Sequence, residues 1–206
     1  MVMQGLQEIL KPQYTALIVV DIQNDFLHPQ GLVAKKGTDL TDARKRLARI
    51  KEVIAYAREN SIFIVYLQQV QSQATFLPAW WEHWGSLIVE ENTWGAEILE
   101  EFKPQANERE LVVVKRLYDG FNNTDLEFVL KARGITTMVS VGYNTNCCVE
   151  STVRTGFEKG FYQVVLSDCT YSLRGEEIHR AALFNCEKLF GKVVTSHELL
   201  GIWDNR

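Results

Sequence analysis

Short apolar runs alternate along this chain with segments of helical periodicity, and this alternation limits the fold more than any other feature. The runs are apolar at consecutive positions, which is typical of strands buried on both faces. We predict six strands, at 16–20, 62–67, 111–114, 135–141, 162–166 and 192–195. Helices are predicted between them, at 41–60, from 123 or 124 to 134, at 147–158 and at 176–190.

Strands that alternate with helices predict a parallel sheet, because parallel neighbours need long crossovers, which are usually helical. The expected fold class is α/β, a Rossmann-like three-layer α/β/α arrangement with right-handed crossovers. The 206 residues contain no internal repeat, low-complexity tract or linker. We therefore predict one domain that spans residues 1–206.

The charge balance excludes some partners. The formal net charge is −4, and the chain lacks the basic patch of a nucleic-acid-binding protein. No apolar run approaches the roughly 20 residues that a membrane-spanning helix needs. The first ten residues carry Gln and Glu where a secretory signal has basic residues before an apolar stretch. We expect a cytoplasmic protein with reduced thiols and no nucleic-acid or membrane partner.

The cysteines and histidines are not spaced for a structural metal site. No Cys-x-x-Cys, His-x-His or His-Glu-x-x-His pattern occurs. Lone cysteines of this kind are mostly small buried hydrophobic residues. The cysteines are Cys147, Cys148, Cys169 and Cys186, and the histidines are His28, His83, His179 and His197.

Three reactive residues follow predicted strands. Asp21 comes directly after the first strand, Lys115 after the third, and Cys148 opens the helix after the fourth. The carboxyl ends of parallel strands meet at one edge of the sheet, where ligands bind. A nearby lysine and a helix N-terminus both favour a thiolate, and a carboxylate can take the thiol proton. Taken alone, an Asp after a strand is more often a turn or capping residue, a Lys there is usually solvated, and a Cys that opens a helix is usually a packing residue. Spacing therefore leaves two interpretations open: a catalytic cluster, or three unrelated structural residues.

Three segments resemble the motifs of a known family. Residues 16–26 read ALIVVDIQNDF, residues 113–126 contain VVKR, GF and TDL, and residues 142–152 read GYNTNCCVEST. In this order and spacing they resemble the isochorismatase-like cysteine hydrolases, over about residues 14–195. The resemblance implies the isochorismatase-like α/β fold and a hydrolase that acts on carbon–nitrogen bonds of linear amides.

The resemblance also implies specific roles. Cys148, rather than Cys147, aligns with the nucleophile, and Asp21, rather than Asp25, aligns with the catalytic carboxylate. Lys115 aligns with the lysine that supports the thiolate. A cis peptide bond is expected before Asn144, with the backbone N–H groups of Asn144 and Cys148 forming an oxyanion hole.

The same comparison bears on metals and cofactors. Nicotinamidases of this family carry an Asp-x-His metal element soon after the second strand, whereas residues 67–73 read LQQVQSQ and contain neither residue. We therefore predict no metal and no cofactor. Family members that cleave isochorismate generally lack the nucleophilic cysteine, so Cys148 indicates cleavage of a carbon–nitrogen bond.

Three further segments, at 93–98, 118–124 and 180–191, resemble the ureidoacrylate amidohydrolases, which are close to the biuret and triuret hydrolases. The implied reaction is cleavage of a small ureide or carbamoyl amide through a thioester, with release of ammonia or a carbamoyl product. Two features depart from that branch: Ser172 stands where a Gln is usual, and the run from Trp80 to Trp84 is unfamiliar.

Several residues are candidates for contact with a small-molecule amide or ureide substrate. Aromatic side chains are expected to wall the pocket and amides to bond the ureide, although core packing is the alternative for each aromatic residue and loop orientation for Gln23. The candidates are Phe26, Gln23, Gln68, Phe121, Asn122 and Tyr143.

The aromatic segment at 68–93 forms either a pocket wall or an oligomer contact, with a simple surface loop as the third possibility. Family members are commonly dimers or tetramers, which implies a homo-oligomer. Two other functions stay open: an amidase for another small amide or N-carbamoyl acid, and a non-catalytic binding or scaffold protein. The presence of Asp21, Lys115 and Cys148 counts against the scaffold.

Overall fold

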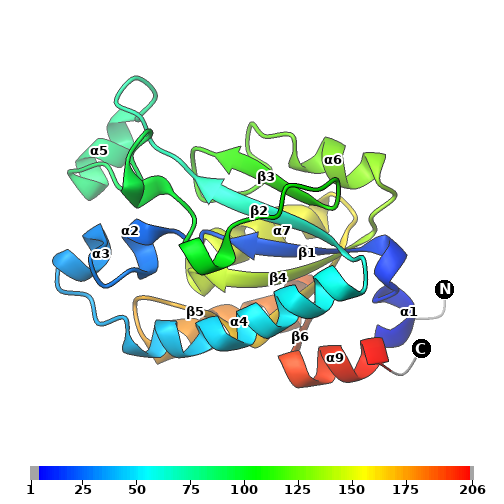
Figure 1. Ribbon diagram of the computed structural model, residues 1–206. Helices are drawn as coiled ribbons and strands as arrows, with labels where there is room; N and C mark the ends of the chain where they lie inside the picture. Colours follow the sequence, from blue (N-terminus) through cyan, green and yellow to red (C-terminus); the bar gives the residue numbers. More distant parts are fainter. Residues whose placement is uncertain (1–4, 205–206) are drawn as a thin grey trace.

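The computed structural model describes residues 5–204 and contains a six-stranded, entirely parallel sheet in the order β3-β2-β1-β4-β5-β6 (Figure 1). The predicted α/β fold with a parallel central sheet is confirmed. The fifth strand is longer than predicted and continues to Tyr171. The strands are β1 (Thr15–Val20), β2 (Phe63–Gln69), β3 (Glu110–Lys115), β4 (Thr137–Tyr143), β5 (Tyr162–Tyr171) and β6 (Lys192–Val194).

Helices cover both faces of this sheet. In Figure 1, α4 and α9 cross the near face, and α6 and α7 lie on the far face. The main helices are α4 (Thr41–Glu59), α6 (Leu126–Ala132), α7 (Glu150–Glu158), α8 (Glu176–Asn185) and α9 (Ser196–Asp204). Two π-helical segments, η4 (Thr145–Val149) and η5 (Cys186–Phe190), adjoin α7 and α8, so each predicted helix there is two segments of different winding. Helix α9 was not expected from the sequence.

Short helical segments complete the chain and lie mostly in the connections. No helix among residues 5–204 is long and apolar enough to cross a membrane. The short segments are α1 (Leu6–Ile9), η1 (Pro12–Tyr14), α2 (Asn24–Leu27), α3 (Leu32–Lys35), α5 (Pro78–Trp84), η2 (Trp94–Ala96) and η3 (Glu100–Phe102).

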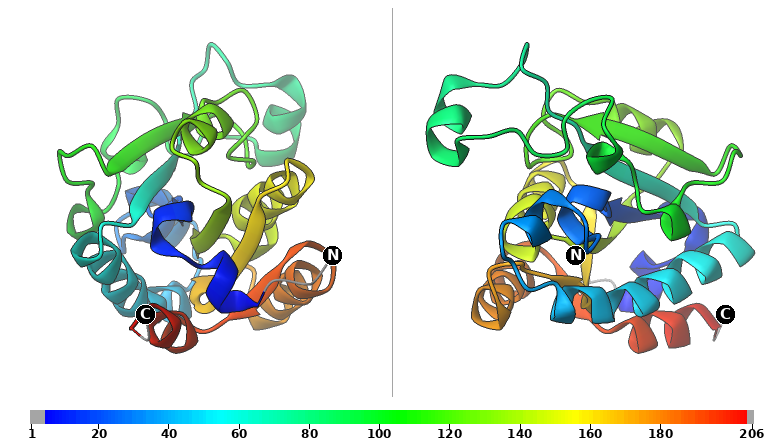
Figure 2. Two further views of the ribbon diagram at one scale, coloured as in Figure 1. Left: turned by 90° about the vertical axis from the view of Figure 1, so that its right-hand side faces the viewer. Right: turned by 60° about the vertical axis from the view of Figure 1, so that its left-hand side comes forward.

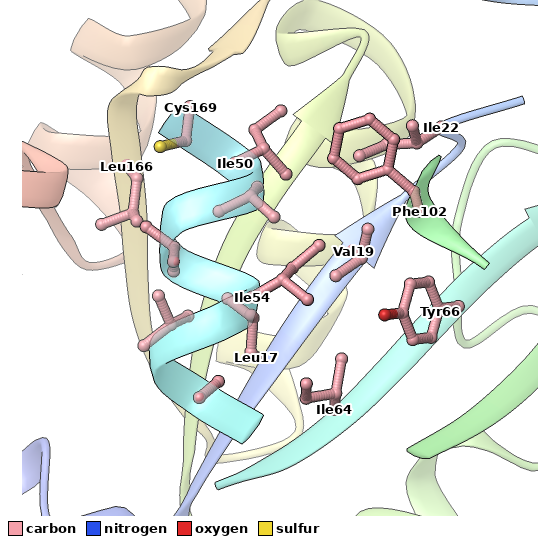
Figure 3. Packing of buried hydrophobic residues seen from close by; sticks show 14 of the residues in the cluster. Leu17, Val19, Ile22, Ile50, Ile54, Ile64, Tyr66, Phe102, Leu166 and Cys169 are labelled. Atoms are coloured by element: carbon pink, nitrogen blue, oxygen red, sulfur yellow. The ribbon is translucent and has the colours of Figure 1, made fainter. Parts of the chain in front are cut away.

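The sheet divides the hydrophobic core into two halves. Strand β1 contributes side chains to both halves, and every one of its residues is buried. Leu17 and Val19 face α4, where Ile50 and Ile54 pack against them (Figure 3). The alternate residues of β1 face the other half, which α6 and α7 cover. Side chains of successive strand residues point to opposite faces, so a strand buried on both sides must be apolar throughout.

The order of strands in the sheet changes direction at β1: β2 and β3 follow on one side of it, and β4, β5 and β6 on the other. A crevice forms at the carboxyl ends of strands at such a switch point. The approach of β4 to β1 is close: a Cβ atom at Gly142, whose φ is +111°, would lie 2.1 Å from the carbonyl oxygen of Val20. A glycine is required there because other residues are strained at this φ and no side chain fits the space.

The segment between β2 and β3 carries α5 and projects beyond the edge of the sheet (Figure 2, right). Its aromatic residues are divided between two environments. The rings of Trp80 and Tyr118 lie 4.5 Å apart, and Trp84 Nε1 donates a hydrogen bond to the Tyr118 hydroxyl at 2.9 Å. Trp81 is 54% exposed. Contacts with Tyr118, which follows β3, thus hold one side of the segment against the sheet edge.

Candidate active site

The structure brings Asp21, Lys115 and Cys148 together at the carboxyl edge of the sheet. Lys115 Nζ donates a hydrogen bond to Asp21 Oδ2 at 2.8 Å. The side-chain oxygen of Gln69 lies 3.5 Å from Lys115 Nζ and 3.7 Å from the sulfur of Cys148. Residues that are far apart in the sequence therefore form one cluster, because β1, β2, β3 and β4 are neighbours in the sheet.

The carboxylate of Asp21 is in an environment suited to a base. Burial raises its pKa above the ordinary value, and the positive charge of Lys115 is the largest influence that opposes this rise. Oδ2 is bonded to Lys115, whereas Oδ1 is buried and has no hydrogen-bond partner within the part of the chain that the structure describes. An oxygen without a donor can accept a proton from a neighbouring group.

Lys115 is a fixed positive charge. Burial acts to lower the pKa of this lysine, but Asp21, through its charge and its hydrogen bond, and the neighbouring Cys148 outweigh burial and raise it. Its ammonium also donates to the carbonyl oxygen of Leu117 at 3.1 Å. An ammonium that is buried and bonded on several sides keeps its proton and its position, so it can balance negative charge on the carboxylate or the sulfur.

The two adjacent thiols differ. The Cys147 thiol, burial and the Asp21 carboxylate together raise the pKa of Cys148 well above the ordinary value, although Lys115 opposes them. A hydrogen bond from Cys148 is the main cause of the lowered pKa of Cys147. Lys115 favours the ionised sulfur, as the sequence predicts, but the other three influences outweigh it. The resting group is a thiol, and its proton needs an acceptor.

Gln69 is a central residue of this cluster that the sequence analysis missed. Its backbone is held by Gln23, whose Nε2 donates to the Gln69 carbonyl at 2.7 Å and whose Oε1 accepts from the Gln69 N–H at 2.9 Å. Nε2 of Gln23 also donates to the Ala96 carbonyl. The side chain of Gln23 is therefore engaged with the backbone of Gln69 and Ala96, which fits the alternative of loop orientation rather than substrate contact.

Gln68, rather than Gln69, was expected from the sequence to contact the substrate. Successive residues of a strand point to opposite faces, and Gln69 is the one that pairs in register with Lys115. Gln68 instead donates from Nε2 to the Ala96 carbonyl at 2.8 Å. That register places Gln69 and Lys115 at the same level of the sheet, and the sequence by itself carries no signal for it.

The cluster opens into a cavity of about 500 Å³. Asn144 and Cys148, whose backbone N–H groups were predicted to form an oxyanion hole, both line it, and so does Phe26. The predicted cis peptide bond between Tyr143 and Asn144 is present. The remaining lining residues are Val33, Lys36, Thr38, Gln69, Gln71, Trp80, Trp84, Ser86, Ile88, Tyr118, Asn146, Cys147, Leu173 and Arg174. Trp80 and Trp84 thus make the segment at 68–93 a pocket wall.

Three other candidates for substrate contact lie outside the cavity lining, and for the two aromatic ones the alternative of core packing is what the structure has. The ring of Phe121 is buried in the core half under α6 and stacks on Phe161, with ring centroids 6.0 Å apart. Tyr143 is completely buried, and its hydroxyl donates to the carbonyl oxygen of Ala43 in α4. Asn122 is exposed and does not line the cavity.

Among residues 5–204, no group of three or more His, Cys, Asp or Glu side chains is arranged to hold a metal ion. His179 bonds the hydroxyl of Thr145, in the segment that leads to Cys148, through Nδ1 at 2.8 Å. Burial lowers the pKa of this histidine.

Comparison with known proteins places the chain in a family. Residues 15–198 match the Isochorismatase domain family. Among curated proteins, a ureidoacrylate amidohydrolase, RutB, of Caulobacter segnis is 36% identical over 92% of this chain and 86% of its own length.

Solved structures of similar fold support the same family. A cysteine hydrolase from Pseudomonas syringae pv. phaseolicola has a TM-score of 0.84 at 26% identity, covering 95% of this chain and 94% of its own. An N-carbamoylsarcosine amidase from Thermoplasma acidophilum has a TM-score of 0.74 at 26% identity, covering 88% and 96% of the two chains. The parallel sheet, the three motifs and these matches agree: the chain belongs to the isochorismatase family.

Proposed function

We propose that this chain is a cysteine-dependent amidohydrolase that cleaves a carbon–nitrogen bond of a small ureide or carbamoyl amide through a thioester intermediate. It is a hydrolase of linear amides, as its curated relatives are. The observation that carries the proposal is the buried Asp21–Lys115 pair, 2.8 Å apart, beside a nucleophilic sulfur that faces a cavity.

The first step forms the thioester. As the sulfur of Cys148 attacks the substrate carbonyl carbon, Asp21 Oδ1 takes the thiol proton. The raised pKa of Asp21 makes it a stronger base than an exposed aspartate. Negative charge moves to the carbonyl oxygen, where the backbone N–H groups of Asn144 and Cys148 stabilise it. When the carbon–nitrogen bond breaks, Asp21 gives the proton to the departing nitrogen.

The second step releases the product. A water molecule attacks the thioester carbon while Asp21 accepts one of its protons, and the sulfur leaves and recovers that proton from Asp21. Lys115 keeps its charge throughout, since the nearby negative groups hold its pKa high. The carboxylate therefore alternates between base and acid, and the lysine stabilises its ionised form.

The substrate class rests on the relatives. Ureidoacrylate amidohydrolases at 34–36% identity and an N-carbamoylsarcosine amidase both act on compounds with a carbamoyl nitrogen. A biuret, a triuret or a ureidoacrylate-like ureide is the proposed substrate, and another small amide or N-carbamoyl acid is the alternative. A homo-oligomer, dimer or tetramer, and a cytoplasmic location remain part of the proposal. Light scattering of the purified protein measures the oligomeric state.

The decisive experiment compares two adjacent thiols. Ammonia release is measured from biuret, triuret, ureidoacrylate, N-carbamoyl amino acids and simple amides, with the wild type, Cys148→Ala and Cys147→Ala. We expect turnover of a ureide or carbamoyl compound by the wild type and by Cys147→Ala, and none by Cys148→Ala. Mass spectrometry of the quenched reaction should detect an acyl adduct on Cys148.

Circular dichroism and thermal unfolding of both variants control for misfolding. If Cys147→Ala is the inactive variant, the nucleophile is misassigned by one residue. If no compound is hydrolysed and iodoacetamide does not modify Cys148, the chain is a binding or scaffold protein instead.

A further inference from the structure

The charged side chains on the cavity wall are all of one sign. Lys36 and Arg174 line the cavity, and no Asp or Glu belongs to its lining among residues 5–204. The chain as a whole carries a net charge of −4, so this local excess of positive charge is opposite to the average surface. A cavity lined by one sign of charge concentrates ligands of the other sign.

Lys36 is anchored at the cavity by the segment that carries α5. It follows α3 directly, and its Nζ donates a hydrogen bond to the hydroxyl of Ser86 at 2.7 Å. Ser86 also lines the cavity. An ammonium has three donors, so two N–H bonds of Lys36 are left for a ligand. Lys36 and its neighbour Lys35 are both exposed, but only Lys36 lines the cavity.

Arg174 is held by the loop that follows β5. The backbone N–H of Leu173 donates to Asn144 Oδ1 at 2.8 Å, and the N–H of Arg174 donates to the Ser172 hydroxyl at 3.1 Å. That hydroxyl in turn donates to Asn146 Oδ1 at 2.7 Å. The loop that carries Arg174 is thereby fixed to the loop that carries the nucleophile, and Ser172 has a defined part in this.

Aromatic rings form the wall beside these two cations. The guanidinium of Arg174 lies 5.6 Å from the ring centre of Trp84, within the range of a cation–π contact. Trp84 bonds the Tyr118 hydroxyl, and Trp80 packs against the Tyr118 ring. Phe26 completes the aromatic lining. A volume of about 500 Å³ is in the range for drug-sized ligands and is far more than one carbamoyl group occupies.

We infer that the cavity selects N-carbamoyl amino acids with an aromatic side chain: the carbamoyl group meets Cys148, the carboxylate binds Lys36 and Arg174, and the ring packs on Trp80, Trp84 and Tyr118. This inference rests on the proposed function and, among the substrates named there, favours the N-carbamoyl acids over biuret and triuret. Positive charge accounts for the carboxylate, and the aromatic wall together with the volume accounts for a ring that a simple ureide lacks.

Three ligands separate these contributions. N-carbamoylphenylalanine carries both the carboxylate and the ring, 2-phenylethylurea lacks the carboxylate, and N-carbamoylglycine lacks the ring. Calorimetry measures their binding to Cys148→Ala, and kcat/KM is measured with the wild type. We expect N-carbamoylphenylalanine to exceed each of the other two at least ten-fold in affinity and in kcat/KM, and its advantage over 2-phenylethylurea to shrink as the salt concentration rises.

Variants assign the preference to residues. In Lys36→Met and Arg174→Gln, the ratio of the N-carbamoylphenylalanine value to the 2-phenylethylurea value should fall at least five-fold in each, mainly through KM. Lys35→Met and Arg180→Gln remove the same charges from exposed positions outside the cavity lining. These two controls should leave the ratio within two-fold of the wild type.

Two outcomes overturn the inference. One is equal binding of N-carbamoylphenylalanine and 2-phenylethylurea, and the other is an equal loss of preference in the Lys35 and Lys36 variants. Either result leaves the proposed function intact if any carbamoyl compound is hydrolysed in a Cys148-dependent reaction. Because calorimetry needs no turnover, selective binding without hydrolysis supports the inference about the cavity and contradicts the proposed function.

Discussion

The side chain of Gln23 forms two hydrogen bonds with the backbone of Gln69. Its amide nitrogen donates to the Gln69 carbonyl at 2.7 Å, and its amide oxygen accepts from the Gln69 N–H at 2.9 Å. The side chain of Gln69 is thereby directed toward Cys148 and Lys115. Gln23, which follows β1, thus positions Gln69 at the end of β2, next to the proposed nucleophile Cys148.

Replacement of Gln69 is the first prediction. Gln69→Leu should reduce kcat/KM at least ten-fold, because the amide that contacts both the sulfur of Cys148 and the ammonium of Lys115 is lost. Gln68→Leu removes the neighbouring amide, which points away and bonds Ala96, and should change kcat/KM less than three-fold. Steady-state kinetics on one carbamoyl substrate checks both. Equal losses in the two variants would contradict the assignment of the strand face.

The second prediction concerns the buried ion pair. Lys115→Met should lower the free energy of unfolding by about 3–5 kcal/mol near neutral pH, because an ionised Asp21 is left buried without its partner. Without Lys115 the pKa of Asp21 rises further above its unfolded value. The loss should therefore be smallest below pH about 4, where Asp21 is protonated in both states, and should grow as pH rises.

Urea unfolding at several pH values measures this loss. The double variant Lys115→Met with Asp21→Leu removes both charges and should be more stable than Lys115→Met alone near neutral pH. A stability loss in Lys115→Met that does not depend on pH would mean that packing of the lysine stem, rather than its charge, stabilises the site.

The third prediction is the acid side of the pH profile. Asp21 accepts the thiol proton only when it is ionised, so kcat/KM should fall as pH decreases through the pKa of Asp21. Burial raises this pKa, and the midpoint should therefore lie above the ordinary value of about 3.9 for an aspartate. Circular dichroism at each pH distinguishes this titration from acid unfolding. A midpoint at or below the ordinary value, with the protein still folded, would contradict the assigned base.

The fourth prediction tests the close approach of β4 to β1. Gly142→Ala should destabilise the protein by more than about 4 kcal/mol, since the new methyl group meets the Val20 carbonyl at 2.1 Å and the backbone φ is +111°. Gly160→Ala is the matched control: its φ is +87°, but no atom lies within 4 Å of the added carbon. It should cost about 1–2 kcal/mol. Similar losses in the two variants would show that φ alone, and not the contact, sets the cost.

Much of the fold was predictable because strands and helices follow from the local pattern of apolar residues. The run at 16–20 is apolar at every position, and this requires a strand covered on both faces, as β1 is. The helix α4 begins at the predicted Thr41 and ends one residue before the predicted end. The sequence analysis missed α9, whose apolar residues contact α4 and β5 from the end of the chain. A short amphipathic helix of this kind forms through tertiary packing more than through propensity.

The sequence by itself determined the order of the strands along the chain and the presence of Asp21, Lys115 and Cys148 after three of them. It did not determine which glutamine joins them, because Gln68 and Gln69 are alike in composition and only the register of β2 against β3 separates the two faces. Nor did it determine that Phe121 stacks in the core while Lys36 and Arg174 line the cavity. The face of the sheet to which a side chain points, and the distance between two loops, depend on how the elements pack against one another. The order of residues along the chain does not specify either.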